Sequence, residues 1–132
     1  SIAGPLSNIL LAFLSAIPMI YIQAKYGQPG LNDLSPAAVV HNLCLMFYII
    51  NLNLAVFNLL PVPPLDGSRV LSGILPQHQY MKLVQYENYI AVIFLLVIFI
   101  FPGVLSRIMH PFTTGIGYLI NIIAVPVVKA LL

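Results

Sequence analysis

Asp66 is the residue best placed for chemistry, because it ends a run that interrupts an apolar segment. The run reads Phe57-Asn58-Leu59-Leu60-Pro61-Val62-Pro63-Pro64-Leu65-Asp66-Gly67. Prolines remove backbone donors and push the residue before them toward extended geometry, so a helix that reaches Leu60 must stop there and continue as an extended strand. A carboxylate that follows a broken apolar helix is a candidate functional group.

Three roles for Asp66 are open from the residues alone. Its carboxylate could pair with Arg69, three positions later, or cap a helix that begins at Gly67, since Asp is a favoured N-cap residue. It could also bind a metal such as zinc, whose catalytic sites combine three protein ligands with a water.

The histidines of this chain do not complete such a zinc site. His41 lies nineteen residues before Leu60, about 28 Å along a helix. His78 and His110 occupy two other connecting segments, and no H-E-x-x-H motif is present. If Asp66 binds zinc, we expect its co-ligands to lie outside this chain.

The composition indicates that these residues are positioned by membrane helices. The 132 residues are 61% apolar and 6% charged, whereas a soluble domain carries about 25% charged residues. The net charge of +2 comes from scattered single residues. This pattern excludes soluble enzymes, disordered tails and nucleic-acid binders, so no nucleic-acid partner is expected.

Four apolar stretches approach the roughly 17–25 residues of a membrane span. They are Leu6–Ile22, Ala37–Leu60, Tyr89–Leu105 and Thr114–Val128. The fourth contains Asn121 and Pro126, and it spans only with its flanks or lies at the interface. The sequence therefore predicts an all-α, multi-pass integral membrane protein. We expect one domain over 1–132, a bundle of three to four transmembrane helices with a Pro-rich extended break before Leu65-Asp66-Gly67.

Two helix faces are expected to look inward. A stripe of small or short residues recurs every four positions in the first helix, at Gly4, Asn8, Ala12 and Ala16, a spacing typical of close helix packing. In the second helix Asn51, Ala55 and Asn58 share one face. We expect the Asp66 carboxylate to face an interior cavity and to approach Asn58.

Two motifs resemble those of the site-2 protease family of intramembrane zinc metalloproteases. In that family an Asn stands eight residues before the Asp of a Leu-Asp-Gly motif, with prolines between, as Asn58 does before Asp66. Ala3-Gly4-Pro5-Leu6-Ser7-Asn8 resembles the Ala-Gly-Pro-x-x-Asn segment that opens the next core helix in the small prokaryotic branch.

The resemblance implies a zinc-dependent endopeptidase of the cell membrane that cleaves transmembrane segments of protein substrates within the lipid bilayer. Asp66 would be the third Zn²⁺ ligand. The other two ligands and the general base would come from an H-E-x-x-H helix upstream of Ser1. Asn58 would be catalytic, stabilising charge on the substrate carbonyl. The substrate-binding residues would be Pro61, Pro63, Pro64 and Leu65, which would pair with an unwound substrate strand. The chain would be the C-terminal part of the enzyme core and inactive alone.

Two other classes of function remain open. One is a proteolytically inert homologue that binds membrane partners. The other is an unrelated small carrier that uses Asp66 as an ion or proton site. An upstream H-E-x-x-H motif on an apolar helix would indicate the protease.

Overall fold

The computed structural model describes residues 2–132, and within that range every regular element is helical. The elements are α1 (Ala3–Tyr26), α2 (Pro36–Leu59), α3 (Gly67–Val70), the 3₁₀ helix η1 (Leu71–Gly73), α4 (Gln77–Gln85), α5 (Glu87–Ile100) and α6 (Pro102–Leu131). The all-α fold expected from the sequence is confirmed.

Helices α1, α2 and α6 are long and apolar enough to cross a membrane. The 24 residues of α1 or of α2 extend about 36 Å at the standard rise, against a hydrocarbon core of about 30 Å. Helices α4 and α5 together pass the same test, but they meet at a bend of 63°. The prediction of three to four membrane-spanning helices is confirmed.

In the second half of the chain, the helix boundaries differ from those of the membrane spans expected from the sequence. The stretch Tyr89–Leu105 is interrupted, since α5 ends at Ile100 and α6 begins at Pro102. Phe101 between them has φ −126° and ψ 71°, outside the helical region, as expected for a residue that precedes proline. The 14 residues of α5 extend only about 21 Å, so α5 alone is too short to span.

Helix α6 contains both the segment around His110, which was expected to be a connection, and the expected fourth stretch, Thr114–Val128. It runs for 30 residues with Pro111 and Pro126 inside it. Each proline removes one backbone donor, yet membrane helices tolerate this because neighbouring groups and local adjustments satisfy the freed carbonyl. Together with its flanks, the expected fourth stretch is therefore long and apolar enough to cross a membrane.

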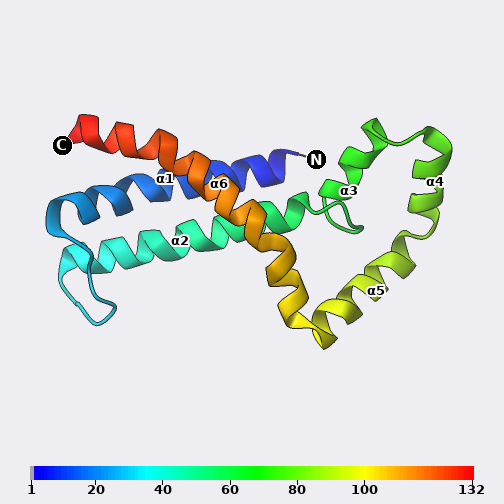
Figure 1. The fold of residues 1–132 in the computed structure, drawn as a ribbon, viewed down its shortest axis with the longest axis horizontal. Helices are drawn as coiled ribbons and strands as arrows, with labels where there is room; N and C mark the ends of the chain where they lie inside the picture. The colour runs from blue at the N-terminus through cyan, green and yellow to red at the C-terminus, as the bar shows by residue number, and fades with distance from the viewer. Residues whose placement is uncertain (1) are drawn as a thin grey trace.

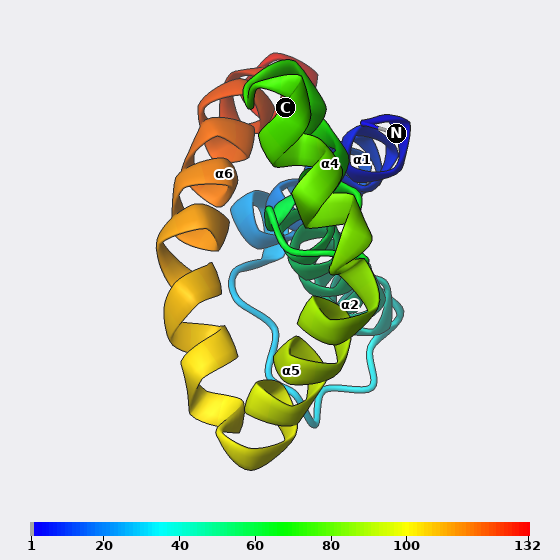
Figure 2. The same cartoon turned by 90° about the vertical axis from the view of Figure 1, so that its right-hand side faces the viewer.

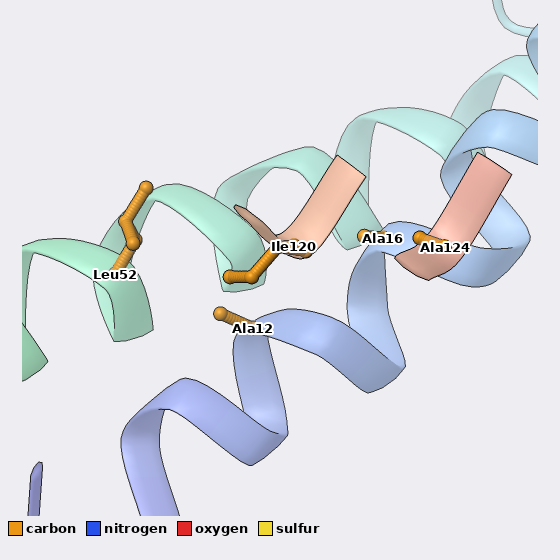
Figure 3. Packing of buried hydrophobic residues seen from close by; sticks show 5 residues of the cluster. All are labelled: Ala12, Ala16, Leu52, Ile120 and Ala124. Carbon is orange, nitrogen blue, oxygen red and sulfur yellow. The ribbon is translucent and has the colours of Figure 1, made fainter. Parts of the chain in front are cut away.

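Helices α1 and α2 form an antiparallel hairpin, and α6 crosses it (Figure 1). Ala12 and Ala16 of α1 are fully buried. They face Leu52 of α2 and Ile120 and Ala124 of α6 (Figure 3). Small side chains allow this close approach, which matters because membrane helices associate mainly through van der Waals packing. The small-residue stripe of α1 is thus a packing surface.

A second buried cluster holds the end of α2. Val56 and Leu60 pack against Met109 of α6, and Leu65 and Phe94 pack against this cluster. The rings of Phe57 and Phe94 lie 6.3 Å apart between centroids. Viewed from the end where α3 and α4 project, α6 runs along one side of the molecule (Figure 2). The chain that follows α2 is therefore fixed by α5 and α6.

Candidate metal centre

The backbone leaves helical geometry after Leu59 and returns to it at Gly67, where α3 begins. Residues 60–66 form bends and turns. The Val62 N–H donates to the Leu60 carbonyl at 2.8 Å, and the Leu65 N–H donates to the Val62 carbonyl at 2.9 Å. The predicted break is confirmed, but the backbone inside it turns instead of running as an extended strand. The φ of about −65° that each proline imposes suits turns as well as strands.

Gly67 makes the tight junction between α2 and α3 possible. A Cβ atom at this position would overlap the carbonyl of Leu59 and the carbonyl oxygen of Leu60. Only glycine lets α3 begin against the end of α2. The glycine of Leu65-Asp66-Gly67 thus fixes where Asp66 stands.

Neither structural role considered for Asp66 is realised. It holds the N-cap position of α3, but its side chain makes no capping hydrogen bond. Arg69 forms no ion pair with any side chain in 2–132, so it does not hold the Asp66 carboxylate. Asp66 is half-buried.

The Asp66 carboxylate lies against the first turn of α1. A Cβ atom added at Gly4 would stand 3.2 Å from Asp66 Oδ2, closer than ordinary van der Waals contact. The two motifs, Ala3–Asn8 and Asn58–Gly67, are thus brought together at one end of the molecule. Sequence reasoning assigned Gly4 to helix packing and missed that it makes room for Asp66. The sequence did offer one signal for this close contact: the first member of the small-residue stripe in α1 is Gly, whereas the later members are Asn or Ala.

Asn58 lies on the last two turns of α2 and is half-buried. Earlier in the helix, the Asn51 amide donates to the Phe47 carbonyl and the Asn53 amide to the Ile49 carbonyl, each at 2.8 Å. The Asn58 side chain makes no hydrogen bond to any other residue that the structure describes. Its amide is available to a bound molecule. Its predicted approach to Asp66 stays a prediction.

The four residues predicted to bind substrate lie in different surroundings. Pro63 is buried and Leu65 is half-buried, whereas Pro61 and Pro64 are exposed. Pro61 lines an apolar cavity of about 380 Å³ between the end of α2 and α6, where Phe112 and Ile116 form the opposite wall. This cavity is large enough for a bulky apolar side chain.

Asp66 can supply one ligand to a metal. Across residues 2–132, no three His, Cys, Asp or Glu side chains are grouped as a metal site would need. His41 is buried near the start of α2, nineteen residues before Leu60, while His78 and His110 are exposed on α4 and α6. The half-buried Asp66 carboxylate suits zinc as one donor of a shared site. Any zinc site that includes it needs ligands from outside residues 2–132.

Comparison with known families identifies the chain. The family model described as peptidase family M50 matches residues 1–101. The chain belongs to peptidase family M50. This is the family of the site-2 proteases, so the resemblance that the two motifs indicated is confirmed. Both motifs lie within the matched residues of the M50 chain.

Two curated relatives carry the printed name "Putative zinc metalloprotease". YwhC of Bacillus subtilis (strain 168) is 41% identical over 102 residues, which are 77% of this chain and 45% of YwhC. MJ0611 of Methanocaldococcus jannaschii is 37% identical over 71 residues, 54% of this chain and 31% of MJ0611. The M50 chain thus spans less than half the length of these relatives. No solved structure is significantly similar to it.

Family membership narrows the possible functions. An M50 chain with three apolar helices long enough to span belongs to a multi-pass membrane peptidase family. An unrelated carrier is set aside, because the peptidase family model matches residues 1–101 of the 132. A proteolytically inert member of the family remains compatible with these observations.

Proposed function

We propose that the full-length protein is a zinc-dependent endopeptidase of the cell membrane that cleaves transmembrane segments of membrane proteins. Asp66 supplies one zinc ligand, and residues 1–132 form one domain of the enzyme. The observation that carries the proposal is the place of the Asp66 carboxylate. It lies at the end of a broken apolar helix and against Gly4, in the first turn of α1.

The ion, when bound, supplies a Lewis acid that activates water and polarises the scissile carbonyl. The role of Asp66 is to hold and orient that ion. Gly67 and the turns of the break fix the backbone that carries Asp66, and Gly4 leaves space for its carboxylate. The remaining ligands and the general base come from the upstream part of the protein, as the family resemblance implies.

Asn58 is proposed as the residue that stabilises charge on the substrate. Its amide is not engaged by other residues of 2–132, so an N–H donor is available to the carbonyl oxygen of a substrate. A fixed donor of this kind stabilises the negative charge that develops as the peptide bond is attacked. The inward face that Asn58 shares with Ala55 supports this role.

Substrate binding is assigned to the break, at Pro61, Pro63, Pro64 and Leu65. The apolar cavity beside Pro61 accommodates a large side chain of the unwound segment. Unwinding is needed because an intact helix engages its own carbonyls in hydrogen bonds. The Leu60 and Val62 carbonyls already accept local hydrogen bonds, so we propose that side-chain burial contributes more here than strand pairing.

The test is to replace Asp66 by Asn in the full-length protein and to measure both zinc content and cleavage of a membrane-embedded substrate in liposomes. We expect both to be lost, because a neutral amide is a poor zinc ligand and the ion and its activated water are compromised together. The matched control is Asp33→Asn. Asp33 lies in the α1–α2 loop, where its side-chain oxygen accepts from the Ser35 N–H at 2.9 Å, a bond that Asn can also make.

Full activity in Asp66→Asn would contradict the metalloprotease proposal. Absence of cleavage by the unmodified protein, with zinc bound, would instead identify an inert member of the family.

A further inference from the structure

A second cavity lies on the other side of the break. It has a volume of about 410 Å³ and is bounded by the α2–α3 connection, α3, η1, α4 and the start of α5. Its lining is mixed. Arg69, Ser72, Tyr80 and Glu87 contribute polar groups, and Leu83 and Val84 contribute apolar surface. Of the residues named in the protease proposal, only Pro63 lines this cavity.

The cavity carries one positive and one negative side chain that lack partners. Arg69 from α3 and Glu87 from the first turn of α5 both line it. Neither side chain forms an ion pair or hydrogen bond with another residue in the described range 2–132. An anion suits the first turn of a helix, where the helix dipole is positive. The cavity therefore presents a donor for an anion and an acceptor for a cation, with no net charge.

The position of the cavity indicates a lipid headgroup as its occupant. Helices α3 and α4 lie beyond the end of the membrane-spanning α2 (Figure 1). Tyr80, Leu83 and Val84 follow helical spacing along one face of α4, and the rest of this helix is mostly polar, including Lys82. A helix of this kind lies in the membrane–water interface, at the depth of phospholipid headgroups.

We propose that this cavity binds a phospholipid whose headgroup carries a phosphate and a primary ammonium, as phosphatidylethanolamine does. The Arg69 guanidinium donates hydrogen bonds to the phosphate, and the Glu87 carboxylate accepts them from the ammonium. Leu83 and Val84 contact the glycerol and the first acyl carbons. A choline headgroup has no N–H to donate, and a glycerol headgroup has no cation for Glu87.

The experiment is native mass spectrometry of the full-length protein in detergent, with phosphatidylethanolamine, phosphatidylcholine and phosphatidylglycerol of identical acyl chains. We expect about tenfold more phosphatidylethanolamine to be retained than either other lipid, because the others lack one charge-assisted hydrogen bond. Arg69→Gln should lose all three lipids. Glu87→Gln should keep phosphate binding and lose only the preference for ethanolamine over choline.

Three further variants separate the site from general effects. Arg69→Lys and Glu87→Asp keep the charges, so they should keep the preference even if the neutral variants fold poorly. Lys82→Gln removes an exposed charge of α4 that does not line the cavity, and it should behave as the unmodified protein. Asp66→Asn should also retain the lipid, because this site does not depend on the protease function.

Equal retention of the three lipids, or stronger retention of phosphatidylglycerol, would overturn the proposal. So would a preference that survives both Arg69→Gln and Glu87→Gln. A protein that retains none of the three lipids would overturn the proposal as well.

Discussion

Asn58 differs from the two asparagines before it in α2 because its amide is not used by the helix. Asn51 and Asn53 each donate to the carbonyl four residues earlier, whereas Asn58 makes no such bond in the described chain. We expect Asn58→Ala to lower the rate of cleavage by about 10²–10³, the loss typical of one oxyanion donor. Zinc content should be unchanged, since the proposal gives Asn58 a role toward the substrate and none in holding zinc.

The control for this prediction is Asn53→Ala, an exposed asparagine on the same helix, which should keep nearly full activity. Loss of zinc in Asn58→Ala would assign that residue to the metal site. An unchanged rate would remove it from the catalytic machinery.

Gly4 tests the contact between the two motifs. In Gly4→Ala the new methyl group would stand 3.2 Å from Asp66 Oδ2, so the carboxylate must shift by a few tenths of an ångström. We expect zinc affinity to fall by about 10–100-fold, the range found for residues that support metal ligands. Gly115→Ala in α6 is the control, because a Cβ there meets nothing within 4 Å. Equal zinc affinity in the two variants would show that Gly4 does not position the carboxylate.

At this scale the sequence predicts the helix break before Asp66, whereas it does not predict which residues surround the carboxylate. The proline run alone shows that a helix breaks before Asp66, because the restriction on φ is local to each residue. The contact of Asp66 with Gly4 joins residues 62 positions apart in sequence. No local pattern encodes such a contact, which depends on how α1 and α2 pack.

The junction between α2 and α3 depends on Gly67. We expect Gly67→Ala to destabilise the full-length protein by about 1–3 kcal/mol, the cost of forcing extra atoms into a packed site, and to abolish cleavage. The added Cβ would overlap two carbonyl groups of the backbone, which cannot move aside as a flexible side chain can. Thermal unfolding in detergent measures the first effect.

Gly73→Ala is the matched control, since a Cβ at Gly73 meets nothing within 4 Å. It should be neutral or slightly stabilising, because alanine restricts the unfolded chain more than glycine does. Equal stability of the two variants would mean that the α2–α3 junction is not rigid.

The prolines in the second half of the chain show that a proline alone does not predict where a membrane helix ends. Pro102 does mark a helix end, because Phe101 before it leaves helical geometry. The apolar run continues through this point, so composition alone hides the boundary. Pro111 and Pro126 lie within one continuous α6. Whether a membrane helix stops at a proline depends on what else satisfies the freed carbonyl, and this is decided by the packing of neighbouring elements.

At the scale of the whole molecule, the candidate site lies at one end of a three-helix packing unit. The α1–α2 hairpin and α6 fix Gly4, Asn58 and Asp66 relative to one another through the clusters around Ala12 and Val56. The M50 relatives extend well beyond the matched segment, since it covers 45% of YwhC and 31% of MJ0611. The proposal that the other zinc ligands come from outside residues 1–132 leads to a prediction about the full-length protein.

We expect residues 1–132 alone to bind no zinc tightly and to cleave nothing, whereas the full-length protein binds one zinc and cleaves a membrane-embedded substrate. The reason is the ligand count: a catalytic zinc needs three protein ligands, and no group of three candidate side chains exists among residues 2–132. Metal analysis of both purified proteins measures the first part, and cleavage in liposomes measures the second. A chelator should stop cleavage by the full-length protein, and added zinc should restore it. Stoichiometric zinc on residues 1–132 alone would show that His78 or another side chain moves to join Asp66, and cleavage that persists under chelation would mean that the reaction does not use a metal.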